Sequence, residues 1–76
     1  MRTAFTMLSH TEKRNIETRL YDRFYRSVYE YRRKHSKGNF DNARFFLDRI
    51  WDIQSKLGKP RDISLHAVLY KEVYHD

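Results

Sequence analysis

Three helix-breaking residues divide this chain and limit the folds open to it. Among 76 residues there are only two glycines and one proline, Gly38, Gly58 and Pro60. Each glycine follows a segment whose apolar residues recur every three or four positions, and Pro60 stands just beyond the second glycine, as expected past a helix end. This punctuation predicts an all-α domain of three helices, at residues 9–36, 41–57 and 64–74.

The first predicted helix is the longest and has the clearest start. Ser9 and Glu12 form a capping-box pattern, in which each side chain accepts a hydrogen bond from the other residue's backbone N–H. The apolar stripe that follows is Ile16, Leu20, Phe24, Val28 and Tyr31. Such a helix is about 40 Å long, whereas a compact chain of this length has a radius of gyration of roughly 11 Å. We therefore expect part of the first helix to extend beyond the core.

The two later helices are predicted from their caps and apolar stripes. Asn39 or Asp41 is the expected N-cap of the second helix, and Ser64 that of the third. Ile63 and Val68 have the spacing of a hydrophobic staple around that third cap. The remaining predicted core positions are Ala43, Phe46, Leu47, Ile50, Ile53 and Leu57 in the second helix and Leu65, Leu69 and Val73 in the third.

The domain is small, so we expect its single core to need reinforcement. Disulfides are excluded because there is no cysteine, and the four histidines never stand four residues apart, the spacing that favours a zinc site on a helix. No metal or other cofactor is predicted. A second subunit is the remaining source of burial, and we predict a homodimer. Residues 1–8 are interpreted as an N-terminal arm, and residues 9–76 as one helical domain.

Several aromatic residues lie off the predicted core stripes. Tyr21, Tyr25 and Tyr29 repeat every four residues along the flank of the first helix, and Phe45 faces away from the core side of the second. Tyr, Phe and Arg are enriched where proteins meet, so we expect these four aromatics to form the subunit interface. The alternative is that they stack on nucleobases.

The charge balance points to an anionic partner. Lys and Arg number 16 against 10 Asp and Glu, which gives a formal net charge of +6. Such a balance favours nucleic acid, an acidic protein surface or membrane lipid. No signal peptide or run of about 18 apolar residues is present, so the sequence predicts a cytoplasmic protein with no membrane partner.

The basic residues are ordered along the first predicted helix. A stripe opposite the apolar face consists of Arg19, Arg23, Arg26, Arg33 and Lys37, with Arg32 and Lys34 beside it. Arginines at helical spacing can bind successive phosphates. The alternative is a solvated face, because Asp22 and Glu30 stand four residues from Arg26, and Glu30 four residues from Lys34.

A second basic set surrounds the Gly58 loop. It consists of Lys56, Lys59 and Arg61, which an antiparallel arrangement would bring near Lys13 and Arg14 at the start of the first helix. Together the two sets lie at opposite ends of an elongated molecule, where an extended nucleic acid could contact both. We count Lys59 and Arg61 among the predicted nucleic-acid contacts.

One short motif raises the question of catalysis. The segment Arg61-Asp62-Ile63-Ser64-Leu65-His66 resembles the arginine-to-histidine motif of the HEPN class of helical ribonucleases, at the start of the last helix. That resemblance implies an RNA-cleaving site at Arg61 and His66. A chain with this many arginines and histidines produces such a spacing by chance, and a histidine at this position is more often structural.

The sequence therefore favours a binding protein over an enzyme. The first hypothesis is a nucleic-acid-binding protein, for RNA or DNA, that contacts mainly phosphates and has little sequence specificity. The second is a small inhibitor or adaptor, of the kind phages encode, that binds an acidic surface on a host enzyme. A HEPN-like ribonuclease is the third.

Overall fold

The computed structural model describes residues 9–74, with side chains to residue 71. It contains three helices, α1 (His10–Arg33), α2 (Lys37–Lys56) and α3 (Ser64–Tyr74), and the described residues include no strand. The all-α prediction is confirmed, and the third helix has the predicted bounds. The predicted N-terminal arm, residues 1–8, and the side chain of Val73 lie outside the described residues.

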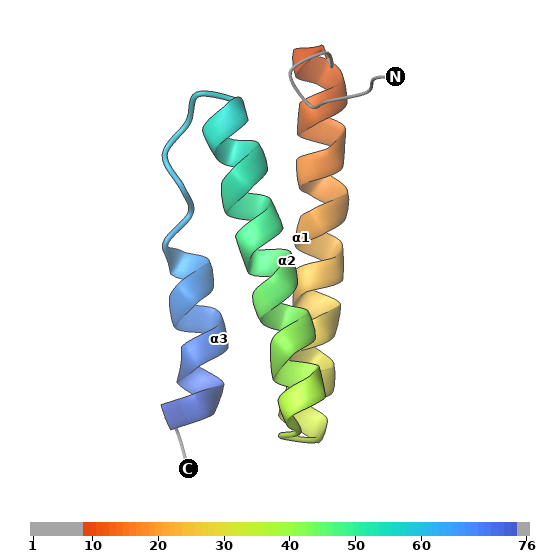
Figure 1. Cartoon of the computed structure of the whole chain (residues 1–76), viewed down its shortest axis with the longest axis vertical. Coiled ribbons are helices and arrows are strands. Elements are labelled where there is room, and N and C mark those ends of the chain that lie inside the picture. Colours follow the sequence, from red (N-terminus) through yellow and green to blue (C-terminus); the bar gives the residue numbers. More distant parts are fainter. Residues whose placement is uncertain (1–8, 75–76) are drawn as a thin grey trace.

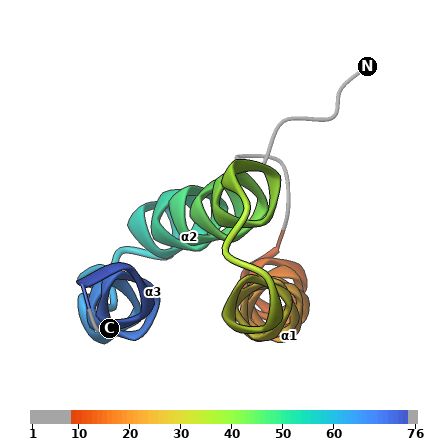
Figure 2. The ribbon, with the colours of Figure 1, turned by 90° about the horizontal axis from the view of Figure 1, so that it is seen from below.

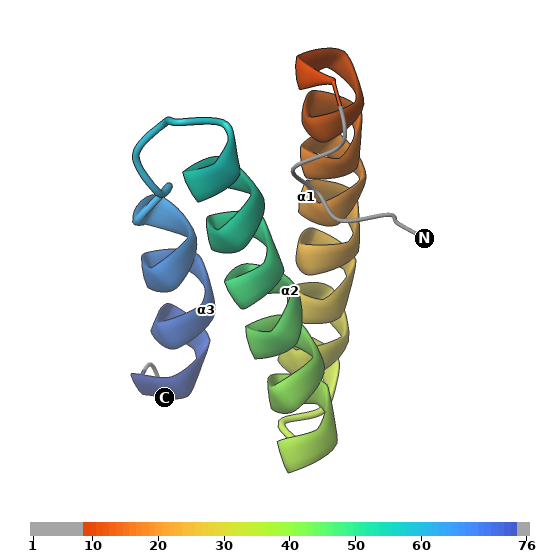
Figure 3. The same cartoon turned by 45° about the horizontal axis from the view of Figure 1, so that its top comes forward.

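The helices run side by side in an elongated molecule. Helices α1 and α2 form an antiparallel hairpin, and α3 runs back along α2 (Figure 1). Seen along the long axis, α2 lies above the space between α1 and α3 (Figure 2), and the tilted view shows the first turns of α1 extending past the end of α2 (Figure 3). The overall extents are 43 × 24 × 15 Å. The expected overhang of the first helix is therefore present, although it is short.

The capping box at the start of α1 is formed as predicted. The Glu12 backbone N–H donates to Ser9 Oγ at 3.2 Å, and the Ser9 N–H donates to Glu12 Oε1 at 2.9 Å. Gly58 also has the predicted role, because its φ of 75° lies in the left-handed region that glycine tolerates best. Its N–H donates to Ser55, and the following N–H of Lys59 donates to Gln54, which ends α2.

The turn between α1 and α2 differs from the prediction. Helix α1 ends at Arg33 instead of residue 36, and α2 begins at Lys37 instead of residue 41. Ser36 is the N-cap, because its Oγ accepts the N–H of Asn39 at 3.1 Å. The Asn39 side chain instead donates to the carbonyls of Glu30 and Lys34, where α1 ends. Gly38 was interpreted as a helix stop, but it lies within the first turn of α2 without a positive φ.

The core takes residues from all three helices. Its fully buried members include Phe24 of α1, Leu47 and Ile50 of α2, and Leu65 and Leu69 of α3. These positions follow the predicted apolar stripes. The staple predicted at the start of α3 is wrong, because Ile63 is 72% exposed. Asp62, and not the predicted Ser64, caps this helix, because its Oδ1 accepts the N–H of Ser64 at 3.1 Å.

Candidate nucleic-acid interface

Helix α2 neutralises its own charges. Three acidic residues on its solvent side each have a basic residue four positions away, the spacing that favours an ion pair on a helix. The pairs are Lys37 with Asp41 at 2.9 Å, Arg44 with Asp48 at 3.4 Å and Lys56 with Asp52 at 3.1 Å. Lys37 therefore belongs to α2 and not to the stripe on the first helix, and its ammonium is already paired. The carboxylate of Asp41 raises the pKa of Lys37.

Helix α1 distributes its charges differently. Arg26 pairs with Asp22 at 3.2 Å, and both side chains stay about 70% exposed, so this pair is worth little. Arg19 and Arg23 are exposed one turn apart, and within the described part of the chain neither side chain has a hydrogen bond or an acidic partner. The guanidinium of Arg33 lies 5.8 Å from the ring centre of Tyr29. Among the described residues, Arg19, Arg23 and Arg33 of the predicted stripe therefore have no acidic partner, and of these three only Arg33 lies over an aromatic ring.

Arg19 and Arg23 border a groove between α1 and α2. The open groove has a volume of about 220 Å³, and Ile16, Leu20 and Phe46 supply its apolar lining. Phe46 and Trp51 are five residues apart on α2, which places them about 140° apart around the helix. Because Trp51 faces His66 of α3, the groove opens on the side of the hairpin away from α3.

Aromatic surface continues from this groove across α2. The ring of Phe46 meets Phe45 edge-to-face, with ring centres 5.2 Å apart, and Phe45 is 55% exposed as predicted. The guanidinium of Arg49 lies 5.9 Å from the ring centre of Phe45. The surface therefore presents guanidinium groups on both sides of a pair of phenyl rings.

The tyrosines on α1 divide into two groups. Tyr25 and Tyr29 are 48% and 55% exposed, and the subunit interface expected at their rings stays a prediction. Tyr21 is different, because its hydroxyl donates to Asp62 Oδ2 at 2.7 Å and accepts from Gln54 Nε2 at 2.8 Å. Burial, together with the hydrogen bond to Asp62, raises the pKa of Tyr21 to about 12. Its hydroxyl thus links α1 to the α2–α3 loop by a hydrogen bond, and does not face outward as the predicted interface would require.

A buried polar cluster joins α1, α2 and the loop, and sequence reasoning missed it. Gln54, only 1% exposed, donates to Glu17 Oε2 at 2.9 Å and accepts the backbone N–H of Asp62 at 2.8 Å. Lys59 Nζ lies 3.0 Å from Glu17 Oε2. Lys59, a predicted nucleic-acid contact, therefore neutralises a carboxylate of its own chain. The available signal was the position of Glu17, seven residues before Phe24 and thus in register with the core stripe.

Arg61 and His66 both lie against Trp51. The guanidinium of Arg61 is 4.9 Å from the centre of the Trp51 ring system, and the His66 ring is nearly parallel to it at 6.4 Å. His66 also stacks on Tyr70, with ring centres 4.2 Å apart. The indole N–H donates to the Asp62 carbonyl at 3.0 Å. Both residues of the HEPN-like motif are thus engaged by aromatic rings of their own chain.

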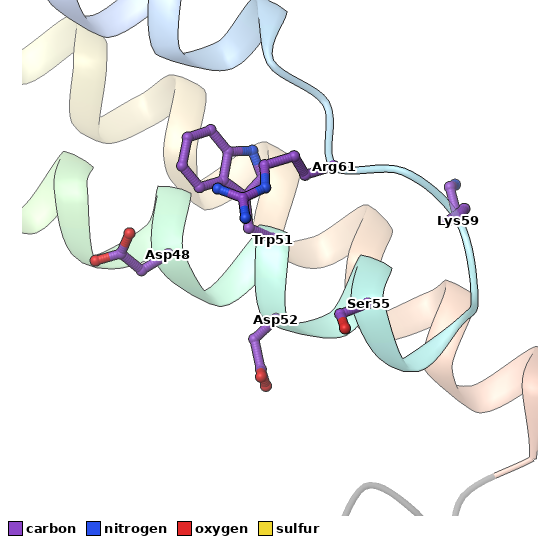
Figure 4. Close-up of a pocket in the computed structure, with 6 residues that line it drawn as sticks. All are labelled: Asp48, Trp51, Asp52, Ser55, Lys59 and Arg61. Carbon is purple, nitrogen blue, oxygen red and sulfur yellow. The ribbon is translucent and has the colours of Figure 1, made fainter.

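The cavity beside this tryptophan is larger but mixed in charge. It has a volume of about 510 Å³, and Figure 4 shows the carboxylates and Ser55 projecting from α2 and the basic residues from the loop. Its lining residues are Asp48, Trp51, Asp52, Ser55, Lys59 and Arg61. This cavity combines two carboxylates, which already pair with Arg44 and Lys56, with two basic residues, whereas the groove between α1 and α2 is lined by two arginines and no carboxylate.

The predicted basic residues Arg32, Arg33 and Lys34 are exposed where α1 ends. His35 follows them and stacks on Tyr31, with ring centres 4.6 Å apart. This end of the molecule is therefore positively charged, and it continues the basic side of α1. Arg32 has an interaction partner within the chain, so we do not count it with the unpaired arginines.

Comparisons of the chain with protein-family models, with curated proteins and with solved structures found no match. The helices described in the structure include none long and apolar enough to cross a membrane. Likewise, the described residues include no group of three or more metal-ligating side chains placed to hold an ion.

Proposed function

We propose that this protein is a non-enzymatic nucleic-acid-binding module that contacts phosphates through α1. The observation that carries the proposal is the pair Arg19 and Arg23, exposed one turn apart and without an acidic partner among the described residues. Like charges four residues apart destabilise a helix by a few tenths of a kcal/mol. The arrangement therefore does not stabilise the fold, but the two positive charges can bind an anionic ligand.

The length of the basic side suits a nucleic-acid strand. Arg19 and Arg33 are fourteen residues apart, which corresponds to about 21 Å along the helix axis. One strand of a duplex carries a phosphate about every 3.4 Å of axis, so roughly six phosphates pass along this distance. Arg23 lies between the two ends, and Lys34 continues the series at the C-terminal end of α1. Contacts to phosphates alone give affinity with little dependence on base sequence.

The exposed tyrosines favour a second candidate function, an adaptor or inhibitor that binds an acidic protein. Tyr25 and Tyr29 place about half of their surface in solvent, and Arg33 lies over the Tyr29 ring. Tyrosine and arginine are enriched in protein interfaces. Replacing Tyr25 and Tyr29 by Ala separates the candidates, because it should spare a purely phosphate-mediated interaction and weaken a protein contact.

The test of the main proposal is a pair of matched charge variants. Arg19→Gln/Arg23→Gln removes the unpaired arginines with a good helix former. Arg14→Gln/Lys71→Gln removes the same charge elsewhere, since both residues are exposed and Arg14 is nine residues before Arg23, about 180° around α1. Circular dichroism of all three proteins checks that the helical content is equal.

Affinity for labelled oligonucleotides is then measured by fluorescence anisotropy over a range of salt concentrations. Each phosphate contact to duplex DNA contributes about −0.9 to the slope of log affinity against log salt. Removing Arg19 and Arg23 should therefore make the slope shallower by about 2 and weaken binding to every sequence alike, while the control variant stays close to the parent. Equal affinities and slopes for the parent and Arg19→Gln/Arg23→Gln would refute the proposal.

A further inference from the structure

We infer that the preferred ligand is single-stranded nucleic acid, with one base held in the groove between Arg19 and Arg23 of α1 and Phe46 of α2. The inference rests on the proposed function and adds to it the strandedness of the ligand. It depends on the lining of the groove, on the aromatic surface beside it and on the spacing of the two arginines.

The apolar lining of the groove can bind the flat face of an unstacked base but not the outside of a duplex. The groove has a volume of about 220 Å³, and between the two guanidinium groups its lining is apolar, formed by Ile16, Leu20 and Phe46. The outside of a duplex offers phosphates and sugars, while the flat faces of its bases are stacked inside. An unstacked base exposes both faces, and aromatic side chains bind such faces with little regard to which base is present.

Phe45 gives this surface a second exposed ring. More than half of its surface is in solvent, and its described ring contact is with Phe46 on the same helix. The core cluster does not include Phe45, so a ligand can cover its ring without disturbing the core. With Arg49 over its ring, Phe45 continues the aromatic surface from the groove to the outer side of α2, where the next base of a strand would lie.

The spacing of the arginines fits an extended strand. Arg19 and Arg23 are four residues apart, which corresponds to about 6 Å along the helix. Phosphates of a stacked strand rise only about 3.4 Å per nucleotide. A strand that inserts one base into the groove is locally stretched, and this brings the phosphates on either side of that base toward the two guanidinium groups.

The Trp51 cavity is the competing site, and its charges argue against it. Asp48 and Asp52 line that cavity, and the guanidinium of Arg61 already lies over the indole ring. A base stacked on Trp51 would have to displace Arg61, and its phosphates would lie near Asp48 and Asp52, whose basic partners are already engaged. Because the chain has one tryptophan, its fluorescence reports directly on whether this cavity is used.

The experiment compares oligo(dT), oligo(rU) and a DNA duplex, each about 12 nucleotides long, at one salt concentration by fluorescence anisotropy. Phe45→Ala and Phe46→Leu alter the aromatic surface, and Ile63→Ala is the matched control because Ile63 is exposed elsewhere. We expect the parent to bind a single strand at least tenfold more tightly than the duplex. Phe45→Ala and Phe46→Leu should each lower single-strand affinity about fivefold or more and leave duplex affinity unchanged.

The outcomes separate the inference from the function on which it rests. Equal affinity for single strand and duplex, or no effect of either phenylalanine variant with the fold intact by circular dichroism, overturns the inference and leaves phosphate binding in place. Strong quenching of Trp51 on binding, unaffected by Phe45→Ala, overturns it in favour of the other cavity. No binding to any oligonucleotide at low salt refutes the proposed function itself. Binding of an acidic amphipathic peptide in its place, weakened by Phe46→Leu, would assign the groove to a protein.

Discussion

Gln54→Glu is the sharpest test of the buried polar cluster. The Gln54 amide nitrogen donates to Glu17 Oε2 at 2.9 Å and to the Tyr21 hydroxyl at 2.8 Å, and its oxygen accepts from the Asp62 N–H. The substitution keeps the shape and the acceptor but replaces the amide donor with a second carboxyl group. It therefore places two acids in contact in a site that is almost closed to solvent.

The size of the penalty follows from the distance and from the pKa of the new group. Two carboxylates at the separation of Gln54 and Glu17 repel by roughly 5–6 kcal/mol with an effective dielectric constant of about 20. The new carboxyl avoids this repulsion by keeping its proton. Holding a group with an ordinary pKa of about 4.3 protonated at pH 7 costs about 3.7 kcal/mol. That cost is the ceiling, and it approaches the total stability of about 3–5 kcal/mol expected for so small a core.

The sign of the pH dependence makes the test specific. The folded pKa of the new carboxyl is raised above its unfolded value, so its penalty is small below about pH 4.3 and grows as the pH rises through the neutral range. In urea denaturation followed by circular dichroism, the loss in free energy of unfolding relative to the parent should therefore be about 3 kcal/mol larger at pH 7 than at pH 4.5. Gln54→Leu adds no titrating group, so its loss in unfolding free energy should change far less with pH. A loss for Gln54→Glu that does not depend on pH would mean that the amide is not enclosed beside Glu17.

Four further predictions follow from the same contacts. Because burial and Asp62 raise the pKa of Tyr21 to about 12, the protein should lose stability as the pH rises from about 10, and Tyr21→Phe should reduce that loss in alkaline melts. The hydroxyl of Ser64, then that of Tyr21, lowers the pKa of Asp62, so its contribution is present above about pH 3.9 and is lost on acidification; Asp62→Asn should flatten acid unfolding curves. His66→Ala should leave oligonucleotide affinity within a few-fold, whereas RNA cleavage by the parent that disappears in this variant would establish an enzyme. Light scattering at micromolar concentrations should give the mass of a homodimer, and a monomer at the highest soluble concentration would contradict this.

The helices were predictable because their signals are local. The capping box of Ser9 and Glu12, the glycine after α2 and the apolar stripes each depend on residues within a few positions of one another. The α1–α2 turn was not predictable in this way. Ser36 and Asn39 can each cap a helix end, and which does so depends on where the Asn39 side chain finds acceptors. Those acceptors, the carbonyls at the end of α1, are in place only when the hairpin has formed.

The candidate interface was predicted in part. Periodicity placed Arg19 and Arg23 on one side of α1, but it could not reveal the apolar groove that Phe46 completes from another helix. It also could not tell which cations the fold itself uses. Lys59 meets Glu17 across 42 positions of sequence, and a contact at that separation has no local signal. Both differences arise because the packing of helices, and not the pattern within one helix, decides which side chains meet.

Helix α2 provides the internal standard against which α1 should be judged. On the solvated face of α2, three bases each have an acid four residues away, in the pairs that Asp41, Asp48 and Asp52 form. If the basic side of α1 were such a face, we would expect an acid at position 15 or 27, four residues from Arg19 or Arg23. The chain has Asn15 and Ser27 there, and Asp22, three residues after Arg19, already pairs with Arg26. Arg19 and Arg23, without an acidic partner among the described residues, thus lie beside a groove with an apolar lining, and this coincidence of unpaired guanidinium groups with an aromatic surface is what favours a ligand that is anionic and flat at once.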